Sequence, residues 1–165
     1  MNLRTERLTL TATTDNDFSS LATIVTNEYV RKYLFDDELL EPLQITDILY
    51  RSINSFQQKA YGIWLIRYRE SDVTIGMVGL WEFFDEPQPQ LLYALLPEHT
   101  GKGIADEASR AILHYSFDTL GFTYLDASCD TPNVSSHKVA TRLGMVKTKE
   151  DEGNGKPITF YRIEK

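Results

Sequence analysis

Residues 95–108 read Leu-Leu-Pro-Glu-His-Thr-Gly-Lys-Gly-Ile-Ala-Asp-Glu-Ala, and this stretch does most to decide the fold. An apolar strand leads through a proline-containing turn into Gly101-Lys102-Gly103, and an amphipathic helix follows at once. Backbone amides converge at the start of a helix, where the helix dipole is positive. The stretch therefore predicts a phosphate site between a strand and a helix.

Two familiar nucleotide-binding motifs do not fit this turn. A dinucleotide fingerprint needs a third Gly or Ala at position 106, where Asp106 would oppose a nearby pyrophosphate. A Walker loop needs four residues between its first Gly and its Gly-Lys pair, and no Gly precedes Gly101 within reach. From this segment alone, a plain strand-to-helix turn that uses glycine for a positive φ remains the alternative.

The composition favours one globular domain over residues 1–165, with a hydrophobic content of 42%. Twenty-four acidic residues against 17 basic ones give a net charge of -7, which disfavours nucleic acid as a partner. The acidic surface suits a cationic substrate, or it serves solubility alone. The single cysteine, Cys129, excludes an internal disulfide, and three scattered histidines give no metal-ligand spacing, so no metal is expected.

The amino-terminal sequence Met-Asn-Leu-Arg-Thr-Glu-Arg carries charges where a signal peptide needs an apolar core. No apolar run approaches the ~20 residues of a membrane span. We therefore expect a cytoplasmic protein with no membrane partner.

Hydrophobic periodicity alternates along the chain between the strand period of two and the helix period of about four. Strands are expected at residues 8–10, 61–69, 73–84, 90–96, 124–129, 145–150 and 158–163. Helices are expected from Asp15 to residue 25, from Pro42 to 56, from Gly103 to Gly121 and from 133 to 143. Two helices thus precede the main sheet, and two alternate with its later strands.

Residues 133–145 carry a second motif, Asn-x-x-Ser-x-x-Val-x-x-Arg-Leu-Gly-Met, shortly after the strand at 124–129. Together with the Gly-Lys-Gly turn, this motif closely resembles the motifs of the Gcn5-related N-acetyltransferase (GNAT) family, in which the second motif usually ends in Lys-Leu-Gly-Phe. Residues 5–10, Thr-Glu-Arg-Leu-Thr-Leu, and residues 75–80, Ile-Gly-Met-Val-Gly-Leu, look like the RimJ/RimL-like branch, which acetylates ribosomal-protein amino termini. The resemblance spans nearly the whole chain.

The resemblance implies an α+β fold of three layers, with a central mixed, mostly antiparallel sheet of about seven strands flanked by about four helices. Its fourth and fifth strands, at 90–96 and 124–129, splay apart and leave a wedge in which the pantetheine arm of acetyl-CoA pairs with free backbone groups. Acetyl-CoA would be the acyl-donor co-substrate, with no metal. The cofactor-binding residues that the resemblance implies are Tyr93, Ala94, Leu95, Gly101, Lys102, Gly103, Ile104, Ala105, Asp106 and Asn133.

Acetyl transfer to an amine needs a base for the amine, a donor for the thioester oxygen and a proton for the departing thiolate. By resemblance, Ser136 supplies this proton, as in the amino-terminal acetylating branch; a helix-capping role is its alternative. Glu82 is the first candidate for the base, because the aromatic residues on either side of it would raise its pKa. The alternatives are Glu98 or His99 acting through water, or a water chain alone.

The segment between the first two helices mixes aromatic and acidic residues, and in the family this loop borders the acceptor groove. We expect substrate contacts from Tyr33 and Phe35 in this segment, and from Trp81 at the end of a strand. The acidic residues 36–38 would attract an ammonium group, or they belong to an ordinary solvated loop.

The expected function is N-acetyl transfer from acetyl-CoA to a primary amine by direct attack in a ternary complex. The acceptor is a protein or peptide amino terminus or a small-molecule amine. The alternative from another class is a CoA-binding sensor or structural relative without catalysis. Three departures from the family pattern motivate it: Thr100 replaces Gln, Arg or Trp, Gln90 replaces Glu, and Ala140 replaces a Tyr acid. Monomer and homodimer both remain open.

Overall fold

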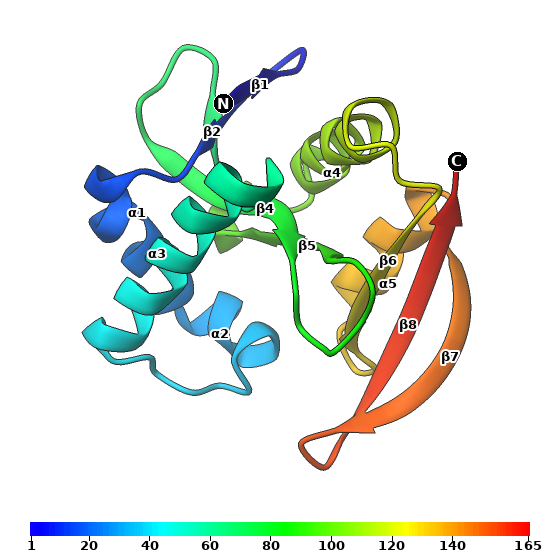
Figure 1. Cartoon of the computed structure of the whole chain (residues 1–165). Helices are drawn as coiled ribbons and strands as arrows, with labels where there is room; N and C mark the ends of the chain where they lie inside the picture. The colour runs from blue at the N-terminus through cyan, green and yellow to red at the C-terminus, as the bar shows by residue number, and fades with distance from the viewer.

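An eight-stranded mixed sheet runs through the centre of the computed structural model, which describes residues 1–165 (Figure 1). Its strands are β1 (Asn2–Arg4), β2 (Leu8–Ala12), β3 (Ile63–Tyr68), β4 (Thr74–Trp81), β5 (Gln90–Leu95), β6 (Tyr124–Asp130), β7 (Val146–Gly153) and β8 (Lys156–Glu164). The spatial order is β1-β2-β3-β4-β5-β6-β8-β7. Neighbouring strands are antiparallel except β5 and β6, which are parallel. The expected mixed, mostly antiparallel sheet is confirmed.

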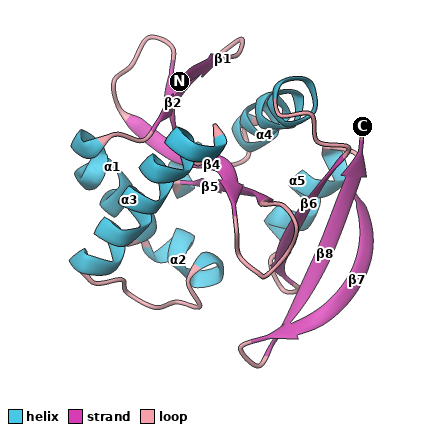
Figure 2. Cartoon of the chain, in the orientation of Figure 1, coloured by secondary structure: helices cyan, strands magenta, loops and turns pink.

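Five helices flank the sheet: α1 (Phe18–Val25), α2 (Glu28–Leu34), α3 (Pro42–Lys59), α4 (Ile104–His114) and α5 (Val134–Arg142). Figure 2 shows α1, α2 and α3 grouped together, apart from α4 and α5. Successive side chains on β3 pack alternately against one group of helices and the other. Ile63 and Leu65 join the apolar cluster of α1 and α3, whereas Trp64 and Ile66 join that of α4. The three-layer α+β fold is therefore confirmed.

The structure has one strand and one helix more than the sequence predicted. The extra strand, β1, has only three residues and no fully buried side chain, so it leaves no alternating pattern. The extra helix, α2, occupies part of the segment expected to be a loop. Asn27 caps it by accepting hydrogen bonds from the amides of Tyr29 and Val30 at 3.0 and 3.4 Å.

The strands β3 and β4 are packed closely where β4 carries Gly79. A Cβ added to Gly79 would lie 2.1 Å from the carbonyl oxygen of Gly62. Gly76, on the same strand, would place a Cβ 2.4 Å from the carbonyl oxygen of Ala94 on β5. The glycines of residues 75–80 therefore allow backbones to approach where a side chain would collide.

The parallel strands β5 and β6 touch at only one residue pair, Gln90 with Asp126. The buried Gln90 side chain ties the strands there, because it accepts a hydrogen bond from Ser128 at 2.7 Å and donates one to Glu86 at 2.9 Å. Beyond this point the two strands diverge, so the expected splaying of the fourth and fifth predicted strands is confirmed. None of the helices has both the length and the hydropathy needed to cross a membrane.

Candidate active site

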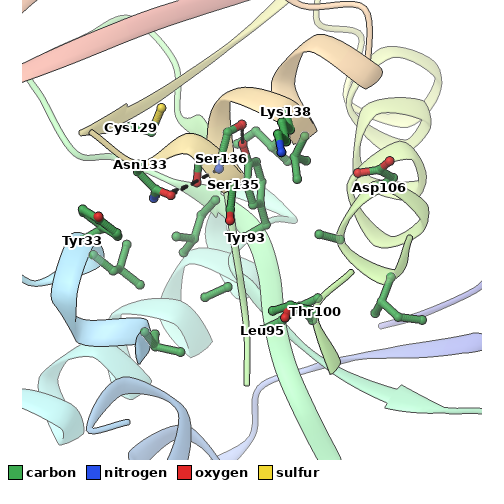
Figure 3. A pocket seen from close by; sticks show the side chains of 18 of the residues that line it. Tyr33, Tyr93, Leu95, Thr100, Asp106, Cys129, Asn133, Ser135, Ser136 and Lys138 are labelled. Carbon is green, nitrogen blue, oxygen red and sulfur yellow. Dashed lines mark hydrogen bonds between the residues drawn. The ribbon is translucent and has the colours of Figure 1, made fainter. Parts of the chain in front are cut away.

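A cavity of about 710 Å³ lies between the splayed strands β5 and β6. The carboxyl-terminal parts of these strands line it, together with the start of α4, the cavity-facing side of α5, and α2. Figure 3 shows Tyr33 of α2 at one side of this cavity and Asp106 of α4 at the other, with Asn133 and Ser136 of α5 between them. The cavity thus joins the predicted phosphate turn to the predicted acceptor region.

The phosphate turn leaves backbone amides free at the start of α4. Gly101 and Gly103 both adopt a φ of +73°, and Gly103 is the N-cap of the helix. The first amide that bonds within the helix is that of Glu107, which donates to the Gly103 carbonyl at 3.0 Å. Residues 104–106 therefore present amides without an intrahelical acceptor, as an anion site requires.

A partly buried carboxylate holds this turn in place. Glu107 accepts hydrogen bonds from the Thr5 hydroxyl at 2.5 Å, the Arg7 amide at 2.8 Å and the Arg7 Nε at 2.6 Å. Burial alone would raise the pKa of Glu107, but these hydrogen bonds and the Arg7 charge outweigh it and lower that pKa. Arg7 also donates to the Lys102 carbonyl at 2.9 Å. The Thr-Glu-Arg motif thus fastens the amino-terminal segment to the phosphate turn.

Two side chains at the turn, those of Asp106 and Thr100, line the cavity, and that of Lys102 does not. Asp106 lines the cavity, but Arg142 of α5 neutralises it through two contacts of 2.5 and 3.0 Å. Thr100 also lines the cavity, and its hydroxyl donates to the Pro97 carbonyl at 2.7 Å. The Lys102 ammonium instead donates to the Glu98 carbonyl at 3.0 Å outside the cavity. The Lys102 side chain is therefore not among the groups that line the cavity, and its contact with the cofactor stays a prediction.

The first turn of α5 fixes the hydroxyl of Ser136. Asn133 is the N-cap, and its Oδ1 accepts from the Ser136 amide at 3.3 Å, while its Nδ2 donates to Ser136 Oγ at 2.9 Å (Figure 3). Because Oδ1 must face the amide N–H, the orientation of the Asn133 side chain is determined. Ser136 Oγ then accepts a hydrogen bond and keeps its own proton to donate. The capping role considered for Ser136 belongs to Asn133.

Two further contacts hold α5 against the sheet. The Tyr93 hydroxyl on β5 donates to the Ser136 carbonyl at 3.0 Å, and burial raises the pKa of Tyr93, so it stays a donor. His137 Nε2 donates to the Thr131 carbonyl at 2.8 Å, and its Nδ1 accepts from the Tyr161 hydroxyl at 2.5 Å. No local pattern predicts this second contact, because Tyr161 lies 24 residues further along the chain, on β8.

Cys129 lies beside these residues and lines the cavity. Burial, and then the charge of Asp130, raise the pKa of its thiol to about 12. A thiol in this state is not a nucleophile.

Of the three residues expected to contact the acceptor, only Tyr33 lines the cavity. Phe35 and Trp81 pack against the apolar cluster of α1, α2 and α3, and the Arg51 guanidinium lies 4.8 Å from the Trp81 ring centre. The expectation for these two is therefore corrected. Side chains that line this end without having been predicted are Tyr29, Val30 and Leu34 of α2, Phe83 after β4, and Asp130 at the end of β6.

Glu82 does not fit the role of base. Its carboxylate lies outside the cavity and accepts hydrogen bonds from the Lys59 ammonium at 2.5 Å and the Tyr61 hydroxyl at 2.8 Å. These hydrogen bonds lower the pKa of Glu82, whereas a base of this kind needs it raised. The assignment is corrected: α3 brings a lysine to this carboxylate, which the flanking aromatic residues did not reveal. No three His, Cys, Asp or Glu side chains gather into a metal-binding group.

Comparison with known proteins agrees with this geometry. Residues 7–146 match the family model of the acetyltransferase (GNAT) domain. The N-acetyltransferase YoaA of Bacillus subtilis is 26% identical over 147 residues, covering 88% of this chain and 82% of YoaA.

Solved structures show the same fold. An acetyltransferase from Agrobacterium tumefaciens has a TM-score of 0.86 at 23% identity, covering 100% of this chain and 95% of its own. RimL, a ribosomal L7/L12 α-N-protein acetyltransferase solved with coenzyme A, has a TM-score of 0.83 at 17% identity, covering 99% and 98%. The family model spans most of the chain and includes both motifs. The chain therefore belongs to the GNAT acetyltransferase family and is by that membership an acyltransferase.

Proposed function

We propose that this protein transfers the acetyl group of acetyl-CoA to a primary amine by direct attack in a ternary complex. The observation that carries the proposal is the divergence of β5 from β6 after one residue pair, with the open start of α4 at the same cavity. A strand edge without a partner can pair with the amides of pantetheine, and a free helix start can hold a pyrophosphate.

Several features of the cavity support the binding of acetyl-CoA. Residues 93–95 of β5 pair with β4 on one side, and β6 leaves their other side free. At the turn, a Cβ on Gly101 would meet no atom within 4 Å, so there is open space for a phosphate. Lys138 of α5 lines the cavity and adds positive charge, whereas the charge of Arg142 is balanced by Asp106. We therefore assign pantetheine to β5 and the pyrophosphate to the amides of residues 101–106.

The chemistry assigns Ser136 as the proton donor to the departing thiolate. The neutral amine attacks the thioester carbonyl carbon, a C–N bond forms, and the C–S bond then breaks. As the C–S bond breaks, Ser136 donates its proton to the sulfur and takes a proton from the attacking nitrogen, while Asn133 Nδ2 stabilises the negative charge that develops on Ser136 Oγ through the bond that it already makes. Ala140, where many relatives have a Tyr acid, is buried and reaches no reacting atom.

Two acceptor classes are compatible with this site. The fold is shared with RimL, which is named as an acetyltransferase of a ribosomal protein's α-amino group, so peptide amino termini are one class. Small amines are the other, because the acceptor end is lined by a few aromatic and aliphatic side chains and an acid. The competing function, a CoA-binding protein without catalysis, rests on the departures at Thr100, Gln90 and Ala140.

Calorimetric titration with acetyl-CoA, followed by a thiol-release assay over a panel of peptides and small amines, tests the proposal. We expect saturable binding and amine-dependent release of CoA. Gly103→Ala puts a side chain where φ is +73°, at a cost of about 1–2 kcal/mol. Because the free turn can relax out of this conformation and acetyl-CoA must restore it, binding should weaken by up to about 5- to 30-fold. Gly121→Ala is the matched control, because Gly121 has the same φ outside the cavity. Binding without turnover on any amine would favour the sensor, and absence of binding would refute both.

A further inference from the structure

One carboxylate in the cavity has no partner. Two carboxylates line the cavity, and Asp106 is already paired with Arg142 at the phosphate end. The other, Asp130, is the last residue of β6, and its carboxylate makes no hydrogen bond or ion pair. The GNAT motifs do not include it, and its sequence context, Cys-Asp-Thr-Pro, is that of an ordinary turn.

The backbone places Asp130 beside the reacting groups. Its carbonyl accepts a hydrogen bond from the Asn133 amide at 2.8 Å, so the turn that ends in the N-cap of α5 begins at Asp130. Ser136 lies one helical turn further on. Tyr33 and Phe83 line the same cavity. A lone carboxylate among aromatic side chains is a suitable environment for an organic ammonium group.

The charges around Asp130 leave it free for such a ligand. Two charged groups act on the Asp130 carboxyl: Asp36, in the loop after α2, and Lys156 of the β7–β8 hairpin. Lys156 is engaged by Asp36, with 3.3 Å between Nζ and Oδ1, and Asn154 Nδ2 lies 3.4 Å from the other oxygen of Asp36. Burial first, and then Asp36, raise the pKa of Asp130, while Lys156 lowers it.

The remaining titratable groups near this end are occupied. On α5, both ring nitrogens of His137 are hydrogen-bonded, and on β6 the Cys129 thiol is protonated. In the segment after Phe83, the Glu86 carboxylate accepts from Gln90. None of these groups is free to accept a proton from an acceptor amine at this end of the cavity, whereas Asp130 is.

We propose that Asp130 receives the ammonium group of the acceptor and takes its proton, so that the substrate is a cationic primary amine. This rests on the proposed acetyl transfer. One proton passes from the ammonium nitrogen to the Asp130 carboxylate, which gives a neutral amine and a carboxylic acid. The amine nitrogen attacks the thioester carbon and the C–S bond breaks; Ser136 gives its proton to the CoA thiolate and is reprotonated by the second proton of the amine nitrogen. Asp130 then returns its proton to water.

The test compares Asp130→Asn with Asp151→Asn, which removes one negative charge from an exposed site on β7, outside the cavity. Acetyl-CoA affinity should change less than twofold in both variants. In Asp130→Asn, kcat/KM for the peptide tetra-alanine with a free amino terminus should fall about 100-fold or more at pH 7. The same variant should bind tetra-alanine at least tenfold more weakly in its complex with CoA.

The pH profile separates a proton acceptor from a structural role. In the wild type, kcat/KM should be level from above the pKa of Asp130 up to the pKa of the peptide amine, about 8. In Asp130→Asn it should rise about tenfold per pH unit over that range, because only the neutral amine can react. An unchanged profile with activity within threefold of wild type would overturn the proposal, as would a parallel loss of acetyl-CoA affinity. Failure of the proposed function itself differs: the wild type would bind tetra-alanine without acetylating it.

Discussion

Replacing Ser136 with alanine removes the proposed proton donor and leaves the rest of the site intact. The amide of residue 136 still donates to Asn133 Oδ1, so the cap of α5 is kept, and the only bond lost is the one from Asn133 Nδ2 at 2.9 Å. Loss of one neutral hydrogen bond at a partly exposed site should reduce the free energy of unfolding by about 1 kcal/mol or less. Loss of a positioned acid should lower kcat about 100-fold, which corresponds to about 2.7 kcal/mol in the barrier.

The assay is steady-state thiol release with the best acceptor of the panel, accompanied by calorimetric titration with acetyl-CoA. We expect kcat to fall while acetyl-CoA affinity stays within threefold, because the backbone amides and the free edge of β5 are untouched. Thr141→Ala serves as the control, since it removes an exposed hydroxyl from the same helix outside the cavity. If Ser136→Ala retains kcat within about threefold of wild type, Ser136 is not the acid and the reasoning from its hydrogen bonds is wrong.

Three further changes test other parts of the structure. Gly79→Ala would place a Cβ 2.1 Å from the Gly62 carbonyl oxygen and should cost about 1–3 kcal/mol or more in urea unfolding; an unchanged midpoint would contradict the close approach. Glu82→Gln should leave kcat within twofold of wild type, because Glu82 lies outside the cavity, and a large loss would restore it as the base. Glu107→Gln should destabilise the protein at pH 7 by weakening the contacts with Arg7. Because the folded pKa of Glu107 is lowered, its stabilisation is complete above the unfolded value of about 4.3 and disappears as pH falls through the folded value. The difference between the two proteins in urea unfolding should therefore shrink below about pH 4, and a constant difference would exclude the ionised carboxylate as its source.

Local sequence patterns predict the fold and the acetyl-CoA side of the site. The Gly-Lys-Gly turn, the helix behind it and the Asn-x-x-Ser motif are contiguous in sequence, and their geometry depends on local backbone preferences and a helix start. The alternation of apolar and polar residues predicts the strands that they connect, and the family resemblance implies the divergence of β5 from β6. These elements lie where they were expected, apart from the side chain of Lys102, which turns away to Glu98.

The acceptor side could not be predicted to the same depth, because its chemistry is set by contacts between distant segments. Glu82 looked like a base beside two aromatic residues, but Lys59, 23 positions earlier, reaches it from the end of α3. Phe35 and Trp81 are aromatic residues of a kind that often lines substrate pockets, but in this structure they pack between the helices and the sheet. No sequence pattern marks Asp130 as a functional residue, since its proposed role depends on a cavity formed by α2, β6 and α5.

Hydrogen–deuterium exchange measured with and without acetyl-CoA reports whether backbone groups hold the donor. We expect slower exchange in two segments, residues 93–95 of β5 and residues 101–106 at the start of α4, with the β7–β8 hairpin unchanged. Saturating acetyl-CoA that leaves both segments unprotected, or that protects only sites outside the wedge between β5 and β6, would contradict this expectation.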